Sequence, residues 1–230
     1  MKPYDEHPGN GRRRVLQTLA VLGIGLHGAL RVAVAQTANA QGVRRMRGTV
    51  SINGKPAAEG SPVRPGDTVV TGRGGLAVFV VGSDAFLMRD NSRLELEGTG
   101  LLANTLRLVS GKLLGVFAAG AGRRIVTATA TVGIRGTGSY QEAEPERTYF
   151  CLCYGTADVA APASKASETF VTRHHESPRF IYGDGRSNPI VPADVDNHTD
   201  SELIMLEALV GRTAPKEVME GPYMNRPYPN

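Results

Sequence analysis

Both cysteines and three of the five histidines of this 230-residue chain fall between residues 151 and 198. They are Cys151, Cys153, His174, His175 and His198. Thiolates and imidazoles are ligands that zinc, copper and iron take in proteins. The pattern predicts a metal site made of Cys151, Cys153, one of the two adjacent histidines and His198. Zn²⁺ is the expected ion, with copper (Cu⁺) or iron (Fe) as alternatives, and no other cofactor is expected.

The C-x-C spacing supports a metal site but leaves alternatives open. Residues two apart in a strand point to the same face, so both sulfurs would lie on one side. Their Cα atoms would be roughly 6.5–7 Å apart, at or beyond the limit for an unstrained disulfide. Two thiolates on one face suit a metal better. A strained disulfide, a thiol-redox function of the pair and two inert buried thiols remain the alternatives.

The sequence around these residues lacks the motifs that a catalytic cysteine would need. A nucleophilic cysteine needs a histidine within hydrogen-bond reach and a third group that orients it. Cys153, His175 and Asp184 supply the residue types, but no known local signature surrounds them. The sequence contains no G-x-S-x-G, H-E-x-x-H or phosphate-binding loop. We therefore expect a binding, scaffolding or sensing protein without catalytic residues, and not an enzyme.

Short strands between turns are expected to position the candidate ligands. From residue 41 to 139, alternating or β-branched runs are interrupted by turn signals roughly every 8–12 residues, the spacing of a sandwich, barrel or short solenoid. One of these runs, 105–109, is expected to end at a Ser110-Gly111 turn. The fold class predicted is mainly β, either irregular β-solenoid-like or sandwich-like, with a small C-terminal appendage of helix and loop.

The candidate ligands belong to the elements that follow. A strand that carries both cysteines is predicted over 148–155 and continues through 156–159. Another, over 168–175, carries the two adjacent histidines. Thr199-Asp200-Ser201-Glu202 has the pattern of a capping box. It predicts a helix over 200–210, ended by Gly211.

Several segments within residues 60–139 resemble the FecR domain family. They are Gly66-Asp67-Thr68-Val69-Val70-Thr71-Gly72, Asn91-Ser92-Arg93-Leu94-Glu95-Leu96, Leu106-Arg107-Leu108-Val109-Ser110-Gly111-Lys112-Leu113 and Thr127-Ala128-Thr129-Ala130-Thr131-Val132-Gly133-Ile134-Arg135-Gly136-Thr137. The resemblance implies a β-solenoid-like fold and no catalysis. The best-understood members join an inner-membrane helix to a cytoplasmic anti-sigma segment. This chain is expected to resemble the stand-alone, exported branch instead.

The N-terminal residues have the pattern of a twin-arginine signal peptide. Arg12-Arg13-Arg14-Val15-Leu16 precedes an apolar stretch, 15–30, that glycines and a histidine interrupt. Ala38-Asn39-Ala40 fits an A-x-A cleavage site, with 33–35 as the alternative site. We expect export to the periplasm in folded form; the alternative is an uncleaved anchor. The predicted domains are the signal peptide, 1–40, a FecR-like β domain, 41–160, and a C-terminal extension with one short helix, 161–230.

The net charge of +4 is concentrated in the predicted signal peptide. Of the 26 basic and 22 acidic side chains, five and two lie in the first forty residues, which leaves 21 against 20. A nearly neutral mature chain lacks the basic surface that nucleic-acid binding requires. The expected partner is an envelope protein or polymer, and no transmembrane anchor is expected after cleavage.

Overall fold

The computed structural model describes residues 40–99, 102–120 and 122–224. They belong to one compact unit, Asn39–Asn230. The predicted twin-arginine motif, its apolar stretch and almost all of the cleavage site lie outside the described residues. Within the described part of the chain, no helix is both long enough and apolar enough to span a membrane.

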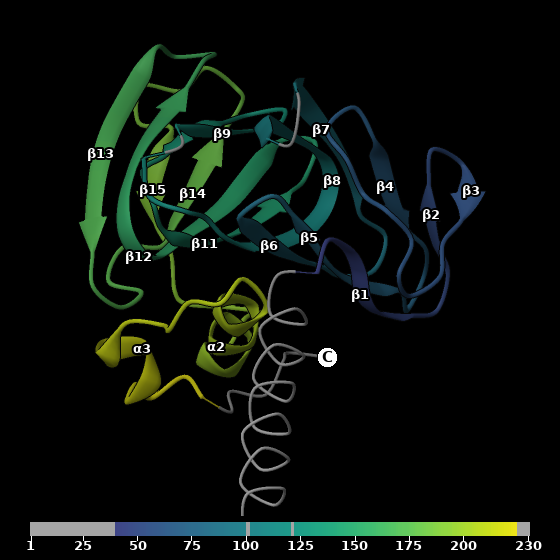
Figure 1. The fold of residues 1–230 in the computed structure, drawn as a ribbon. Helices are drawn as coiled ribbons and strands as arrows, with labels where there is room; N and C mark the ends of the chain where they lie inside the picture. The colour runs from purple at the N-terminus through teal and green to yellow at the C-terminus, as the bar shows by residue number, and fades with distance from the viewer. Residues whose placement is uncertain (1–39, 100–101, 121, 225–230) are drawn as a thin grey trace, which may run out of the picture. The chain divides into compact units, whose positions relative to one another are not determined.

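Fifteen strands in the described residues form two sheets, which confirms the mainly β fold class (Figure 1). The first sheet has the order β1 (Gly42–Arg47), β5 (Leu76–Val81), β6 (Asp84–Met88), β8 (Leu102–Val116), β11 (Gly138–Ala143), β12 (Arg147–Ala161), β14 (Arg179–Tyr182) and β15 (Ile190–Pro192). The second has the order β3 (Lys55–Pro56), β2 (Val50–Ile52), β4 (Thr68–Thr71), β7 (Arg93–Thr99), β8, β9 (Arg123–Val126), β10 (Thr131–Ile134), β12 and β13 (Ala166–Thr172).

Two long strands, β8 and β12, belong to both sheets and close part of the fold into a barrel. The closed path runs β8, β9, β10, β12, β11 and back to β8, and of these pairings only β8–β9 is parallel. Apolar side chains between the sheets form the main core; Phe86, Leu106 and Phe150 are among them. The mainly β fold is thus a closed barrel with extra strands, and a barrel is one of the architectures that the spacing of the turn signals allowed.

A glycine lies at the point where each long strand passes from one sheet to the other. Gly111 in β8 has φ +84°, and a Cβ there would lie 2.2 Å from Ser92 Oγ. Gly155 in β12 has φ +99°, and a Cβ would lie 2.5 Å from a Thr137 methyl carbon. A side chain would be strained and would clash at either position. The expected Ser110-Gly111 turn is therefore wrong: the strand bends at Gly111 and continues in the other sheet.

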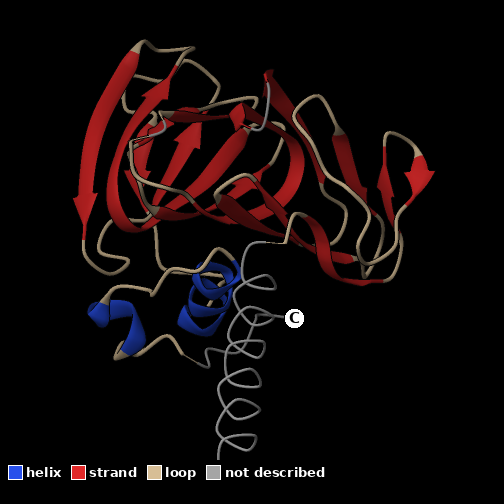
Figure 2. Ribbon diagram, viewed as in Figure 1, coloured by secondary structure: helices blue, strands red, loops and turns tan. Residues whose placement is uncertain are grey.

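The outer face of the first sheet is covered by two helices, α2 (Asp200–Leu209) and α3 (Lys216–Met219), which lie together on one side of the strands (Figure 2). Leu203, Leu206 and Val218 pack from them into a second apolar cluster that also contains Cys151 and Cys153. The predicted capping box of α2 is confirmed, with the Thr199 side chain accepting from Glu202 N–H and the Glu202 side chain accepting from Thr199 N–H.

The two adjacent histidines lie beyond the strand that was expected to carry them. β13 ends at Thr172, and His174 and His175 lie in the loop that leads to β14. His175 has φ +54°, in the left-handed region and outside the β region that side chains in a strand require. In a strand, adjacent side chains point to opposite faces. Because the chain leaves the strand here, both imidazoles turn toward the same carboxylate, that of Asp200.

Candidate metal centre

The two cysteine side chains project from β12 toward the helices. Phe150 and Leu152 face the core between the sheets, and the alternation of the strand places Cys151 and Cys153 on its outer face. Both thiols are free, and both residues are fully buried. The expectation that the sulfurs share one face therefore holds in the structure.

His175 reaches the sulfurs from the loop that crosses over β12. Its backbone N–H donates to Cys153 O at 3.0 Å, which attaches the loop to the C-x-C strand. Its Nδ1 lies 3.4 Å from Cys151 Sγ and 3.0 Å from His198 Nε2. Its Nε2 lies on the opposite side of the ring, 3.0 Å from Asp200 Oδ1. His175 therefore connects the thiols with the start of α2.

His198 approaches from the segment just before α2. Its Nδ1 donates to Asp196 O at 2.6 Å, so its Nε2 points inward toward His175. The ring stacks on Tyr140, with centroids 4.6 Å apart and an interplanar angle of 19°. The hydrogen bond from Nδ1 and the stacking on Tyr140 together fix the orientation of the His198 ring.

A partly buried polar network fixes the backbone beside His198. Tyr140 O–H donates to Glu142 at 2.7 Å, and Asn197 Nδ2 donates to the same carboxylate at 2.6 Å. Arg89 donates to Asn197 O at 2.9 Å and bridges to Glu202 of α2 at 2.8 Å. The network ties the segment that carries His198 to the first sheet and to the helix.

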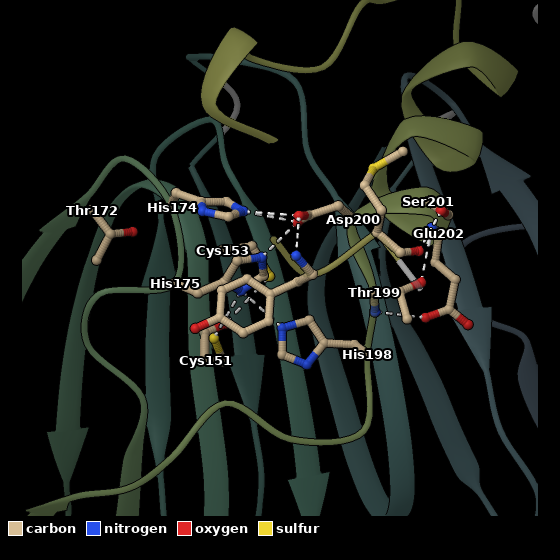
Figure 3. A network of polar contacts seen from close by, with 12 residues as sticks. Cys151, Cys153, Thr172, His174, His175, His198, Thr199, Asp200, Ser201 and Glu202 are labelled. Carbon is tan, nitrogen blue, oxygen red and sulfur yellow. Dashed lines mark hydrogen bonds and ion pairs between the residues drawn. The ribbon is translucent and has the colours of Figure 1, made fainter. Parts of the chain in front are cut away.

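Four ligand atoms meet at one place: the sulfurs of Cys151 and Cys153 and one ring nitrogen each of His175 and His198 (Figure 3). They lie within 4.8 Å of one another, and all four residues are buried. In a zinc tetrahedron with bonds of about 2.0–2.3 Å, ligand atoms are about 3.3–3.8 Å apart. Small shifts of the side chains would place the atoms around an ion. The cluster is thus able to hold a metal.

The hydrogen bonds around the two imidazoles also fit a cation between them. Asp200 and the carbonyl of Asp196 accept from the outer nitrogens, which therefore carry the ring protons. In neutral rings this leaves two lone pairs facing each other across 3.0 Å, between His175 Nδ1 and His198 Nε2. An added proton or a metal ion removes that repulsion, and the sulfurs beside it favour a metal.

His174 is not part of the four-ligand set. Its Nε2 lies 3.0 Å from both oxygens of Asp200, and its ring packs on Tyr223, with centroids 5.3 Å apart. Together with His175 and Asp200 it forms a second group of possible ligands. Of the two adjacent histidines left open by the sequence, the structure brings His175 to the sulfurs and His174 to the carboxylate.

The pKa values of both thiols and of His175 are shifted in the cluster. Burial by itself raises the pKa of Cys151, but the Cys153 thiol and the imidazoles of His198 and His175 lower it well below its ordinary value. Burial and the Cys151 sulfur raise the pKa of Cys153. Burial lowers the pKa of His175, whereas Asp200 and Cys151 outweigh it and raise the pKa to about 9. Cys151 is therefore the thiol that loses its proton first, as metal ligation requires.

The same atoms also have the order of a nucleophilic triad, Cys151 to His175 to Asp200. This is not the triad whose residue types the sequence supplied. Asp184 lies elsewhere, in a surface ion pair with Arg186. Cys151 has no exposed surface, so a substrate could reach the sulfur only if the covering loops opened.

Sequence reasoning missed Asp200 as part of the site. It assigned Asp200 only to the first turn of a helix, and that assignment is correct. Its position two residues after His198 was no signal for this role, because Asp200 accepts from His174 and His175 while His198 donates to Asp196 O. Nothing in the sequence indicated that His174 and His175 would both turn to it.

Comparisons with known proteins give no family for the chain. No family model matches it, and no curated protein matches it. Two crystal structures, at 1.65 and 2.50 Å resolution, of a "putative anti-sigma factor" from Parabacteroides distasonis ATCC 8503 are similar to it, each with a TM-score of 0.47 and 12% identity. The alignments cover 61% and 60% of this chain and 64% and 71% of those chains. The chain thus spans less than two thirds of the first one's length.

Proposed function

We propose that this protein is a non-catalytic, FecR-like binding or sensing domain of the bacterial cell envelope that is stabilised by one Zn²⁺ ion. The observation that carries the proposal is the convergence of four buried ligand atoms from Cys151, Cys153, His175 and His198. These ligands come from three separate segments, namely β12, the loop after β13 and the segment before α2. A metal held by them would fasten the C-terminal third of the chain onto the β fold.

The number and type of the ligands support a structural zinc ion. Two sulfurs and two imidazole nitrogens form the Cys₂His₂ set of structural zinc sites, whereas catalytic sites keep one position open for water or substrate. Full burial of the four residues fits the closed arrangement. Copper (Cu⁺) also binds thiolates and imidazoles, and so does iron, so the identity of the ion is part of the test.

Export in folded form, predicted from Arg12 and Arg13, would give the thiols a route to their metal. Structural zinc sites form as the chain folds, and cytoplasmic thiols are kept reduced. A protein that folds and loads its metal before export enters the oxidising periplasm with both sulfurs already coordinated. The ligand or envelope partner of the domain is not identified by these residues.

A thiol-redox function of the C-x-C pair is the second candidate, because the lowered pKa of Cys151 is a property of reactive thiols. Its full burial opposes this function, since thiol–disulfide exchange requires access to the sulfur.

Metal analysis and mass spectrometry of the purified protein separate the two functions. We expect one zinc per chain in the native state and two free thiols after denaturation without reductant. The variant with Cys151→Ser and Cys153→Ser should contain no zinc. Protein that is metal-free and two protons lighter than its reduced form would contradict the metal function and support the redox one.

A further inference from the structure

Asp200 is the one carboxylate in contact with both adjacent histidines in the described part of the chain, and its own side chain has no exposed surface. One oxygen accepts from His175 Nε2, and both are 3.0 Å from His174 Nε2. Tyr223 N–H donates to the second oxygen at 3.2 Å. A buried carboxylate requires such donors to remain ionised, and here three N–H groups supply them.

These contacts determine which nitrogen of His175 faces the sulfurs. An ionised carboxylate only accepts hydrogen bonds, so the ring proton of His175 is held on Nε2. In the neutral ring Nδ1 then carries the lone pair, which is directed at Cys151 Sγ and His198 Nε2. The neutral ring is thus prepared to bind a cation through Nδ1 without rotating or changing its tautomer.

The position of Asp200 in the chain adds a second constraint. It follows His198 by two residues and begins α2, whose capping box fixes the backbone at Thr199. Its backbone N–H donates to Tyr223 O at 3.1 Å, so the same residue pairs with the C-terminal segment in both directions. Asp200 therefore sets the distance between the segment that carries His198 and the loop that carries His175.

We infer that Asp200 is a positioning residue of the metal centre, which presents His175 Nδ1 to the ion and holds the two histidine segments at coordination distance. This inference rests on the proposed metal function of the four-ligand set. Asp200 itself does not coordinate the ion, and its loss should weaken binding without changing the stoichiometry. Removal of such an outer partner typically lowers metal affinity about 10–100-fold.

The test compares Asp200→Asn with two neighbouring variants of the full chain. Thr199→Ala removes the cap of α2, and Ser201→Ala removes the bond from Ser201 Oγ to Met224 O, 2.6 Å long. Zn²⁺ affinity is measured by competition with a chelator of known affinity. Asp200→Asn should bind about 10–100-fold more weakly, while both neighbours should stay within about threefold of the wild type. An unchanged affinity in Asp200→Asn, or an equal loss in Thr199→Ala, would overturn the inference.

A spectroscopic measurement on the wild type decides the matter even if Asp200→Asn does not fold. The protein is loaded with ¹¹³Cd and labelled with ¹⁵N at histidine. We expect ¹¹³Cd coupling to Nδ1 of His175 and to Nε2 of His198, with the proton of His175 on Nε2. Coupling to Nε2 of His175 would overturn the role of Asp200 and leave the metal function intact. A wild type that binds neither Zn²⁺ nor Cd²⁺ would overturn both.

Discussion

Two adjacent histidines have different tasks in this site because the chain turns between their side chains. His175 has positive φ, and its ring points toward Cys151 Sγ, whereas the His174 ring packs against Tyr223. Both still contact Asp200. The structure thus makes His175 a candidate ligand and His174 only a partner of Asp200, and substitution of each residue tests this difference.

Substitution of each histidine by glutamine should give opposite results. His175→Gln removes a ligand and leaves His198 Nε2 and two sulfurs, so the variant should lose its zinc during gel filtration. His174→Gln removes only a partner of Asp200 and should keep one zinc per chain. Metal analysis of both proteins measures the difference. Retention of zinc by His175→Gln, together with its loss in His174→Gln, would show that His174 and not His175 is the ligand.

For the residues of the site, the sequence indicated which residue types come together, but not which histidine binds or how its ring is oriented. The clustering of Cys151, Cys153 and His198 with one of two histidines followed from residue types and strand alternation alone. The choice of His175 depends on a backbone conformation that a histidine rarely adopts. The part played by Asp200 depends on contacts between residues 25 and 26 positions apart, which no local pattern records.

At the scale of elements, three segments that lie apart in the chain meet beside the metal site. The loop over 173–178, the segment over 196–200 and the C-terminal segment over 221–224 meet around Asp200. Tyr223 packs on both adjacent histidines, with centroids 5.3 and 5.1 Å away. A Cβ on Gly221 would lie 2.3 Å from the His174 ring, so the segment approaches closely.

Chelation of the metal should therefore loosen these segments before the β core. We expect hydrogen exchange to increase first in 173–178, 196–200 and 221–224, while β5, β6 and β8 remain protected. The reason is that the core strands are held by their own ladders and by the apolar cluster between the sheets. The variant Cys151→Ser serves as the control, since chelator should not change its exchange. Uniform loss of protection along the whole chain would contradict this prediction.

A second element-scale prediction concerns the buried ion pair between β6 and β9. Asp84 Oδ2 and Arg123 Nε are 2.5 Å apart, and both side chains are almost completely buried. Asp84 also accepts from Ala118 N–H at 3.0 Å. Asp84→Asn removes the charge that compensates the buried guanidinium, so it should lower the free energy of unfolding by about 3–5 kcal/mol.

Denaturant titration measures this loss, and an exposed pair provides the matched control. Asp158 and Arg135 form the same kind of ion pair at the surface, with exposed fractions of 42% and 66%. Because water screens exposed charges, Asp158→Asn should leave the unfolding midpoint nearly unchanged. Equal effects of the two substitutions would show that burial does not decide the contribution of Asp84.

The elements themselves were largely predictable, and Gly111 shows why one of them was not. Alternating runs and turn residues indicated the strands, and the capping box at Thr199 indicated α2. Gly111 was interpreted as a turn because a glycine after a strand usually permits a reversal. Here the same freedom at positive φ lets β8 bend into the second sheet. A local sequence pattern cannot distinguish a reversal of the chain from a bend within a strand, because the strands that pair on either side of the glycine determine which one forms.

At the scale of the whole molecule, we expect the chain to fold in the cytoplasm and to act in the periplasm. Replacement of Arg12 and Arg13 by lysine should retain the chain in the cytoplasm, because the twin-arginine pattern would be lost. Cell fractionation measures the distribution, with a reporter exported by the unfolded-protein route as the control. Zinc content should be equal in the retained and exported forms if the metal is loaded before export. Unchanged recovery from the periplasm would remove the export proposal.

X-ray absorption at the metal edge of the purified, unreduced protein can show whether the four residues form a closed Cys₂His₂ zinc centre. We expect a zinc edge and a first shell of two sulfurs at about 2.3 Å and two nitrogens at about 2.0–2.1 Å. Contradiction would come from a shell of nitrogen and oxygen without sulfur, which would place the metal away from Cys151 and Cys153, or from protein that shows no metal edge.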